Sequence, residues 1–236
     1  MLVYRKEKMS LINFYEKLST KDRPTYDNPN KTLCIDHPAK IVISGPSGSG
    51  KGNCLTNLMN EMKGSFDNIF IVAKTPDEPL YKYMSRTFKD RMKLLTENID
   101  ELPEQDDEIW KTGQNCVIID DFVCDAKRIN DKIAKLFTMG RKFGGEKCGA
   151  SVIYITQDIY RTPVLLRRQA QYLMLKGKHP NRSLHGILQD YSLPYKKEDF
   201  VNTVNHCNES YSMCCTLDLI TTDDSKKIRC GIYPSL

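Results

Sequence analysis

The 236-residue sequence predicts an α/β protein with a mainly parallel central sheet that is covered by helices on both faces. Short apolar segments rich in β-branched residues alternate with segments whose apolar residues recur at helical spacing. A glycine-rich loop lies between the first strand-like segment and the first helical one. Near the C-terminus, two strand-like segments flank the turn-rich TTDDS, which predicts an antiparallel β-hairpin at the sheet edge.

The expected strands are short and apolar because both faces of a parallel sheet are buried. We expect strands at 40–44, 68–73, 92–96, 115–122, 151–157 and 171–176, and the hairpin strands at 211–220 and 226–233. We expect helices after residue 51, where Leu55, Leu58, Met59 and Met62 lie on one face, and at 78–89 and 129–142. The acidic run 97–108 is expected to be a solvated loop. Residues 1–31 are polar and basic, so we expect an N-terminal arm ahead of one domain, 32–236.

The glycine-rich loop has the composition of a phosphate-binding loop. Its residues are Gly45, Pro46, Ser47, Gly48, Ser49, Gly50 and Lys51, followed by Gly52 and Asn53. Glycines let the backbone fold around an anion, and the N-terminus of the following helix directs free N–H groups toward it. Lys51 would reach the terminal phosphates. A merely flexible Ser/Gly loop is the other interpretation, but the strand before it and the helix after it favour a nucleotide site.

Position 52 departs from the usual pattern, in which a Ser or Thr hydroxyl contacts magnesium. Magnesium keeps several waters even in ordinary phosphate sites, so a water in place of the hydroxyl is physically acceptable. We therefore expect this loop to bind ATP with Mg2+, with a looser hold on the metal. A G-K-G ending also resembles the adenylate-kinase type of loop. A nucleotide kinase, and an ATP-binding assembly module with little turnover, stay open as alternatives.

Polar residues follow two apolar strands downstream of the loop. Asp120 and Asp121 end the segment VIIDD, and Gln157 closes the segment SVIYIT. Because the carboxyl ends of parallel strands meet at one sheet edge, these side chains can face the nucleotide. Asp120 would hold the magnesium shell, Asp121 would polarise an attacking water, and Gln157 would contact that water or the γ-phosphate. A helix cap or turn is the alternative for the acid pair, and strand ends are often polar.

The charge distribution is compatible with a nucleic-acid partner. The net charge of +5 would not by itself indicate one. The acidic run makes the remainder more basic, with clusters at Lys127-Arg128, Arg141-Lys142, Arg167-Arg168 and 176–182. Any one cluster is explained by a solvated surface, but four in one half of the chain are compatible with a phosphate backbone.

Composition also bears on the compartment and on metal sites. The nine cysteines are scattered with no C-x-x-C, which favours a reduced compartment in which cysteine serves as a small apolar residue. The four histidines show no zinc-ligand spacing with them, so zinc is not expected. We also expect no signal peptide and no transmembrane segment, because the N-terminus has no apolar core and no apolar run is long enough.

The ordered set of motifs resembles the FtsK/HerA superfamily of DNA-pumping ATPases. The resemblance covers residues 36–176 and is closest to the viral branch, the genome-packaging ATPases of poxviruses, other large DNA viruses and virophages. It rests on Ile119-Asp120-Asp121, Met139-Gly140-Arg141, Tyr154-Ile155-Thr156-Gln157 and Thr162-Pro163 with Arg167. Asp121 agrees with the viral branch, whereas cellular members more often have Glu; Gly52 departs from the Ser or Thr of the family.

The resemblance implies a RecA-like ASCE core and an ATPase that moves double-stranded DNA, without regard to sequence, into a viral capsid. It implies a homo-oligomeric ring, a hexamer, that docks on capsid proteins, and a location in the cytoplasm of the infected cell (the viral factory) or in the virion. It also implies an arginine supplied by the neighbouring subunit. Arg141 best matches that position; Arg167 and Arg168 are the alternatives.

Overall fold

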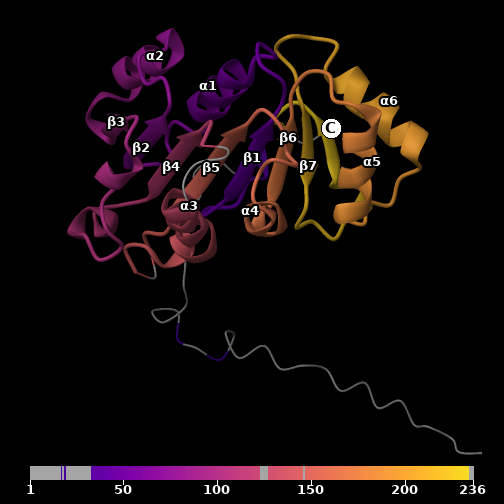
Figure 1. Ribbon diagram of the computed structural model, residues 1–236. Coiled ribbons are helices and arrows are strands. Elements are labelled where there is room, and N and C mark those ends of the chain that lie inside the picture. The colour runs from indigo at the N-terminus through magenta and orange to yellow at the C-terminus, as the bar shows by residue number, and fades with distance from the viewer. Residues whose placement is uncertain (1–16, 18, 20–32, 123–126, 146, 234–236) are drawn as a thin grey trace, which may run out of the picture.

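The computed structural model describes residues 17, 19, 33–122, 127–145 and 147–233. The expected arm 1–31 therefore lies almost wholly outside the described residues. The fold in the described part is the predicted one, an α/β arrangement with a single central sheet between layers of helices (Figure 1).

Eight strands form the sheet within the described residues, in the order β3-β2-β4-β5-β1-β6-β7-β8. Their bounds are Lys40–Ser44 (β1), Asn68–Ala73 (β2), Met92–Thr96 (β3), Asn115–Asp120 (β4), Ala150–Thr156 (β5), Tyr172–Leu175 (β6), Cys215–Asp218 (β7) and Ile228–Cys230 (β8). The pairings from β3 to β6 are parallel, whereas β7 runs antiparallel to β6 and β8 antiparallel to β7. The predicted mainly parallel sheet with a C-terminal hairpin at its edge is confirmed.

The position of β5 decides where the site can form. It pairs in parallel with β1 on one side and with β4 on the other. Ser44 at the end of β1 is opposite Thr156, and Asp120 at the end of β4 is opposite Ile155. The segments that follow β1, β4 and β5 therefore start at the same edge of the sheet.

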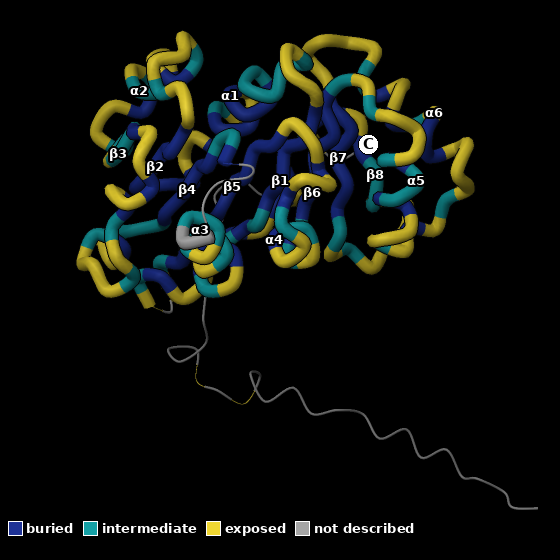
Figure 2. Tube along the Cα trace, viewed as in Figure 1, coloured by how far each residue is buried: buried dark blue, intermediate teal, exposed yellow. Residues whose placement is uncertain are grey.

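Helices cover the two faces of the sheet with separate apolar clusters. They are α1 (Lys51–Glu61), α2 (Pro79–Phe88), α3 (Lys127–Met139), α4 (Val164–Gln169), α5 (Asn181–Asp190) and α6 (Lys197–Cys207), joined in places by short 3-10 turns. One cluster includes residues of α1 and α2, and the other includes residues of α3, α4, α5 and α6. Figure 2 shows the central strands buried between these layers, while the outer sides of the helices are exposed. Both faces of the sheet are thus shielded from water, as a parallel sheet requires.

The element boundaries agree closely with the expected ones for the strands and less well for the C-terminal helices. The strands at 40–44, 68–73 and 92–96 have the expected bounds, and the hairpin strands are shorter than expected. The sequence analysis did not assign α4, α5 or α6; α5 packs against α6, and α6 packs against β7. The acidic run is not wholly a solvated loop, because Ile99 and Leu102 within it are buried in the core.

A disulfide corrects the expectation for the cysteines. Cys207 at the end of α6 is bonded to Cys230 at the end of β8. The expectation that cysteines serve only as small apolar side chains is wrong for this pair, though it suits Cys54 and Cys116, which are buried thiols. The two partners are 23 residues apart and meet only because α6 packs beside the hairpin, so their spacing carries no signal.

Within the described residues, no helix combines the length and the apolar character that crossing a bilayer needs.

A buried ion pair fastens the C-terminal hairpin to the segment that leads into β1. Arg229 of β8 is ion-paired with the carboxylate of Asp218 of β7, and both side chains are almost fully buried. The guanidinium also donates to the backbone oxygens of Leu33, at 2.7 Å, and Cys34, at 3.4 Å. The arginine thus joins both strands of the hairpin to a segment almost 200 residues earlier in the sequence.

We predict that Arg229→Met lowers the free energy of unfolding by roughly 3–5 kcal/mol, because it leaves the buried carboxylate of Asp218 without a countercharge. Urea unfolding of the variant measures this loss. Adding Asp218→Asn to Arg229→Met removes the uncompensated charge and should restore part of the stability. A loss below about 1 kcal/mol in the single variant, the size typical of exposed pairs, would contradict the assigned role.

Candidate active site

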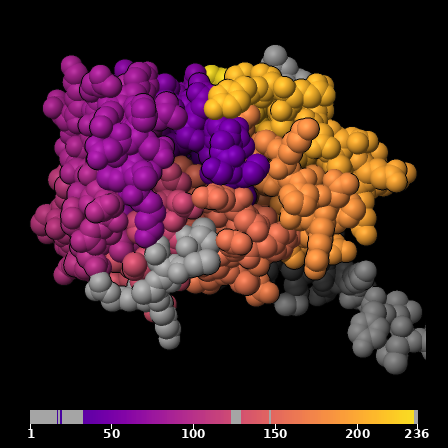
Figure 3. Space-filling view, turned by 45° about the horizontal axis from the view of Figure 1, so that its top comes forward, coloured from indigo at the N-terminus to yellow at the C-terminus, as the bar shows by residue number. Residues whose placement is uncertain are grey.

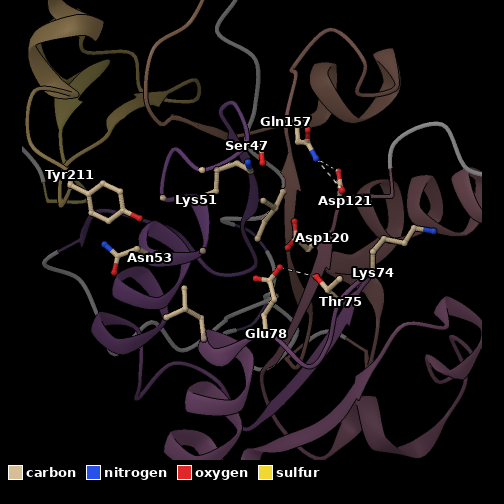
Figure 4. Close-up of a pocket in the computed structure, with 15 residues that line it drawn as sticks. Ser47, Lys51, Asn53, Lys74, Thr75, Glu78, Asp120, Asp121, Gln157 and Tyr211 are labelled. Carbon is tan, nitrogen blue, oxygen red and sulfur yellow. Dashed lines mark hydrogen bonds between the residues drawn. The ribbon is translucent and has the colours of Figure 1, made fainter.

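A cavity of about 280 Å³ opens at the carboxyl edge of the parallel strands, beside the glycine-rich loop. Figure 4 shows side chains from the loop, α1, β4, β5 and the β2–α2 connection converging on it. The residues singled out in the sequence that line it are Ser47, Gly48, Gly50, Lys51, Gly52, Asn53, Asp120, Asp121 and Gln157. Gly45, Pro46 and Ser49 complete the same loop. The structure thus brings together the loop, the acid pair and the glutamine.

The loop conformation depends on glycine at two points. Gly45 lies against the carbonyl oxygen of Lys176, and a Cβ added to Gly45 would come within 2.1 Å of that oxygen. Gly50 precedes α1 with a φ of 93°, in the left-handed region that side chains disfavour. The backbone can therefore turn from β1 into α1 tightly enough to leave the helix N-terminus open to the cavity.

Lys51, the first residue of α1, extends back across the loop. Its ammonium donates to the carbonyl oxygens of Gly45, at 2.9 Å, and Pro46, at 3.1 Å. Partial burial lowers the pKa of Lys51, while the carboxylates of Asp120 and Asp121 act in the opposite direction. The lysine is therefore held over the loop, where phosphate oxygens could replace the two carbonyl acceptors.

Asp120, the last residue of β4, is a carboxylate held in place by a helix of the neighbouring layer. The hydroxyl of Tyr81 in α2 donates to Oδ2 of Asp120 at 2.5 Å. Burial raises the pKa of Asp120 to about 6, whereas the Tyr81 hydrogen bond lowers it. Carboxylate oxygen beside a phosphate loop is the donor type that Mg2+ prefers, so Asp120 fits the expected metal position.

Tyr81 is a site residue that the sequence analysis missed. Tyr81, Met84 and Phe88 recur at helical spacing and are all buried. That pattern assigns Tyr81 to the core, and its ring is indeed packed there. Only the tertiary structure shows that its hydroxyl reaches the carboxylate and orients it.

Asp121 and Gln157 form a second polar pair that lines the cavity. The side-chain amide of Gln157 donates to both carboxylate oxygens of Asp121, at 3.3 and 3.2 Å. Asp121 has a φ of 63°, a left-handed conformation that aspartate tolerates better than most residues. Its backbone N–H donates to the carbonyl of Ile155 in β5, at 3.2 Å. This turn directs the carboxylate toward the end of β5 rather than along β4.

The β2–α2 connection supplies further lining residues that the sequence analysis did not single out. Lys74, Thr75 and Glu78 line the cavity, and the hydroxyl of Thr75 donates to Glu78 at 2.8 Å. Their place in the cavity was predictable from the sequence, because residues that follow β2 must reach the same sheet edge as residues that follow β4. Tyr211 lines the opposite side and follows no strand end, so no comparable signal pointed to it.

Arg141 is not part of the cavity of its own chain. It lies in the 3-10 turn Gly140–Lys142 before β5. Burial lowers the pKa of Lys40, the first residue of β1, and the nearby charge of Arg141 lowers it further. Since β1 has five residues, Lys40 and the loop are roughly 16 Å apart at about 3.3 Å per residue. Arg141 thus lies near the amino-terminal edge of the sheet, opposite its own phosphate loop.

The two alternative arginines differ from each other in their surroundings. Arg167 pairs with Asp190 at 2.9 Å and lies over the Tyr160 ring, 4.8 Å from its centroid. It therefore joins α4 to α5 within one chain. Arg168 is exposed at the surface.

Solved structures of known proteins share this fold. The chain is similar to the genome packaging NTPase B204 from Sulfolobus turreted icosahedral virus 2 in complex with ATP-gammaS, with a TM-score of 0.55 and 15% identity over 82% of this chain and 97% of that one. It is also similar to B204, the DNA-packaging ATPase from Sulfolobus Turreted Icosahedral Virus, with a TM-score of 0.53 and 16% identity over 86% and 97% of the two chains.

No protein-family model matches the chain, and no curated protein matches it at a significant level. At 15–16% identity the structural matches establish the fold alone. The RecA-like P-loop NTPase fold that the resemblance implied is therefore confirmed.

Gly52 has a neighbour that bears on its missing hydroxyl. A Cβ added to Gly52 would come within 3.0 Å of Cδ1 of Leu80 in α2, a contact that the end of a flexible side chain can relieve.

We predict that Gly52→Thr lowers the Mg2+ concentration needed for half-maximal ATP turnover, because the hydroxyl supplies a ligand. Titration of Mg2+ against phosphate release measures the effect.

Gly52→Ala is the matched control, because it adds the contact with Leu80 without a hydroxyl. Its Mg2+ requirement should stay at the level of the unaltered chain. An unchanged requirement in Gly52→Thr would show that another group, such as Asn53, already fills the hydroxyl's role.

Proposed function

We propose that this chain is an ATP-hydrolysing DNA translocase that packages viral double-stranded DNA into a capsid. The observation that carries the proposal is the convergence of Lys51, Asp120 and the Asp121–Gln157 pair on one cavity at the carboxyl edge of β1, β4 and β5. The fold shared with B204, whose structures contain ATP-gammaS and AMPPCP, supports ATP as the nucleotide and packaging as the process.

In this proposal each side chain has a separate task. The loop 45–53 and Lys51 bind the phosphates, and Asp120, oriented by Tyr81, holds Mg2+. The metal would neutralise phosphate charge. Asp121 accepts a hydrogen bond from the attacking water, and Gln157 holds the Asp121 carboxylate from the adjacent strand. Gln157 is thereby placed to sense the loss of the γ-phosphate.

The partners follow from the same proposal. A protein that packages DNA of any sequence must contact phosphates rather than base edges. Exposed basic residues in the second half of the chain, such as Arg168, Lys178 and Arg182, would supply these contacts. The chain would act as a ring, a hexamer, docked on capsid proteins in the infected cell or the virion. The location of Arg141 at the amino-terminal sheet edge supports a role in the site of the neighbouring subunit.

A nucleotide kinase is the second candidate, and Gly52 is the observation that favours it. It would transfer phosphate to a small acceptor rather than to water. The contact between Asp121 and Gln157 favours hydrolysis, because a kinase does not need an amide on the neighbouring strand to hold a second carboxylate.

We predict that Lys51→Ala abolishes ATP binding, whereas Asp121→Asn retains binding and lowers hydrolysis by at least about a hundredfold, the typical contribution of a catalytic base. Calorimetry measures binding, and phosphate release with and without duplex DNA measures turnover. The wild-type chain should be stimulated by DNA. Phosphate transfer to an added nucleotide, indifferent to DNA, would instead identify a kinase. Wild-type turnover in Asp121→Asn would remove Asp121 from the mechanism.

The proposed role of Arg141 has a signature in mixed assemblies. Arg141→Ala should bind ATP nearly normally but hydrolyse it on the order of a thousandfold more slowly, because the arginine stabilises transition-state charge. Mixed with Lys51→Ala subunits, whose own site is inactive but whose arginine is intact, it should recover part of the activity. Lys142→Ala is the matched control and should remain active. No recovery in assembled mixtures would exclude action in trans.

A further inference from the structure

Tyr211 is a large, exposed aromatic residue at the mouth of the cavity. It belongs to the connection between α6 and β7, which we call the 208–214 loop (Asn208–Cys214). Tyr211 is 65% exposed, the highest value among the exposed large hydrophobic residues of the described chain. In Figure 4 it lies on the opposite side of the cavity from Asp121 and Gln157, with Lys51 between them. An exposed ring at this place is not explained by core packing.

The ring of Tyr211 is seated against the start of α1. A Cβ placed on Gly50 would lie 2.9 Å from Cζ and 3.0 Å from the hydroxyl of Tyr211, so the hydroxyl edge of the ring contacts that glycine. The ammonium of Lys176 lies 5.3 Å from the ring centroid. The ring is therefore supported at its hydroxyl edge and by a cation, while most of its surface remains open to a ligand.

The 208–214 loop is anchored rather than loosely attached. Lys176, almost fully buried at the end of β6, donates to the carbonyl oxygens of Met213, at 2.6 Å, and Ser210, at 3.4 Å. The Asn208 side chain accepts from the N–H of Gly177, at 2.7 Å, and donates to the carbonyl of Leu175, at 3.1 Å. The carbonyl oxygen of Lys176 also adjoins Gly45 of the phosphate loop.

The loop is tied to α1 as well. The thiols of Cys54 in α1 and Cys214 are 3.6 Å apart, and both are buried. The 208–214 loop is therefore fixed to α1, which begins at the phosphate loop, and to the end of β6, where the carbonyl of Lys176 adjoins Gly45. In Figure 3 the indigo surface, which includes the glycine-rich phosphate loop and α1, lies between the magenta surface around α2 and the yellow C-terminal part of the chain.

We propose that Tyr211 stacks on the base of the bound nucleotide, with the 208–214 loop holding its ring at the mouth of the cavity. The inference rests on the proposed phosphate site. With the terminal phosphate at the Asp121–Gln157 end, the phosphate chain passes Lys51 and Asn53, and the nucleoside leaves the cavity beside Tyr211. Every base has a π-face, so the stacking selects nucleotides over free polyphosphate without selecting strongly among bases.

Calorimetric titration with ADP and with inorganic tripolyphosphate tests the inference, since the second probe has phosphates and no base. Tyr211→Ala should weaken ADP binding by about tenfold or more, the usual size of a base–aromatic contact, and leave tripolyphosphate binding within about twofold. Tyr211→Phe should bind ADP nearly as the unaltered chain does. Tyr83→Ala, at another exposed tyrosine, in α2, is the control and should change neither affinity.

The outcomes separate this inference from the proposed function. If Tyr211→Ala binds ADP with wild-type affinity, or loses ADP and tripolyphosphate equally, the stacking role is overturned while the phosphate site stands. If the unaltered chain binds neither probe, or if Lys51→Ala binds tripolyphosphate as well as the unaltered chain, the phosphate site itself fails and the stacking proposal fails with it.

Discussion

Parallel pairing of β5 with both β1 and β4 brings three segments, distant in the chain, to one edge of the sheet. The glycine-rich loop follows β1, the acid pair ends β4 and Gln157 follows β5. Each segment alone is a common sequence feature. Their adjacency follows from the strand order, because parallel strands share a carboxyl edge and the register aligns Ser44, Thr156 and Asp120 within one residue. The apolar layers on both faces maintain that register, since a slip by one residue would move every side chain of a strand to the opposite face and disrupt its packing.

The charges at this edge are held in a partly buried setting. Lys51 has a lowered pKa and is bound to its own loop, while Asp120 has a raised pKa and is bound to Tyr81. Both shifts have burial as their main cause, so each charge has lost part of its hydration before any ligand arrives. A bound phosphate would supply an opposite charge to Lys51, and a bound metal ion would supply one to Asp120. Fixed charges that need little reorganisation stabilise a charged transition state more effectively than water does.

The two edges of the sheet carry different features. The carboxyl edge holds the cavity, with Tyr211 at one end and Asp121 at the other. The amino-terminal edge holds Arg141 near the start of β1, beyond reach of the cavity in the same chain. Under the proposed function this separation is useful, because one subunit can present its arginine to the cavity of the next. The ring and the site would then depend on the same sheet geometry.

Local sequence determined the strands, the phosphate loop and the polar strand ends, because hydrophobic periodicity and glycine backbone freedom act over a few residues. The segments 40–44 and 68–73 and the pair Asp120-Asp121 were recognisable for that reason. Tertiary structure alone decided which distant groups meet. Tyr81 has the spacing of a core residue, and the disulfide between Cys207 and Cys230 has no spacing signal. The 208–214 loop that carries Tyr211 is anchored because Lys176, which follows β6, binds carbonyls more than 30 residues away, a contact set by strand order rather than by any local pattern.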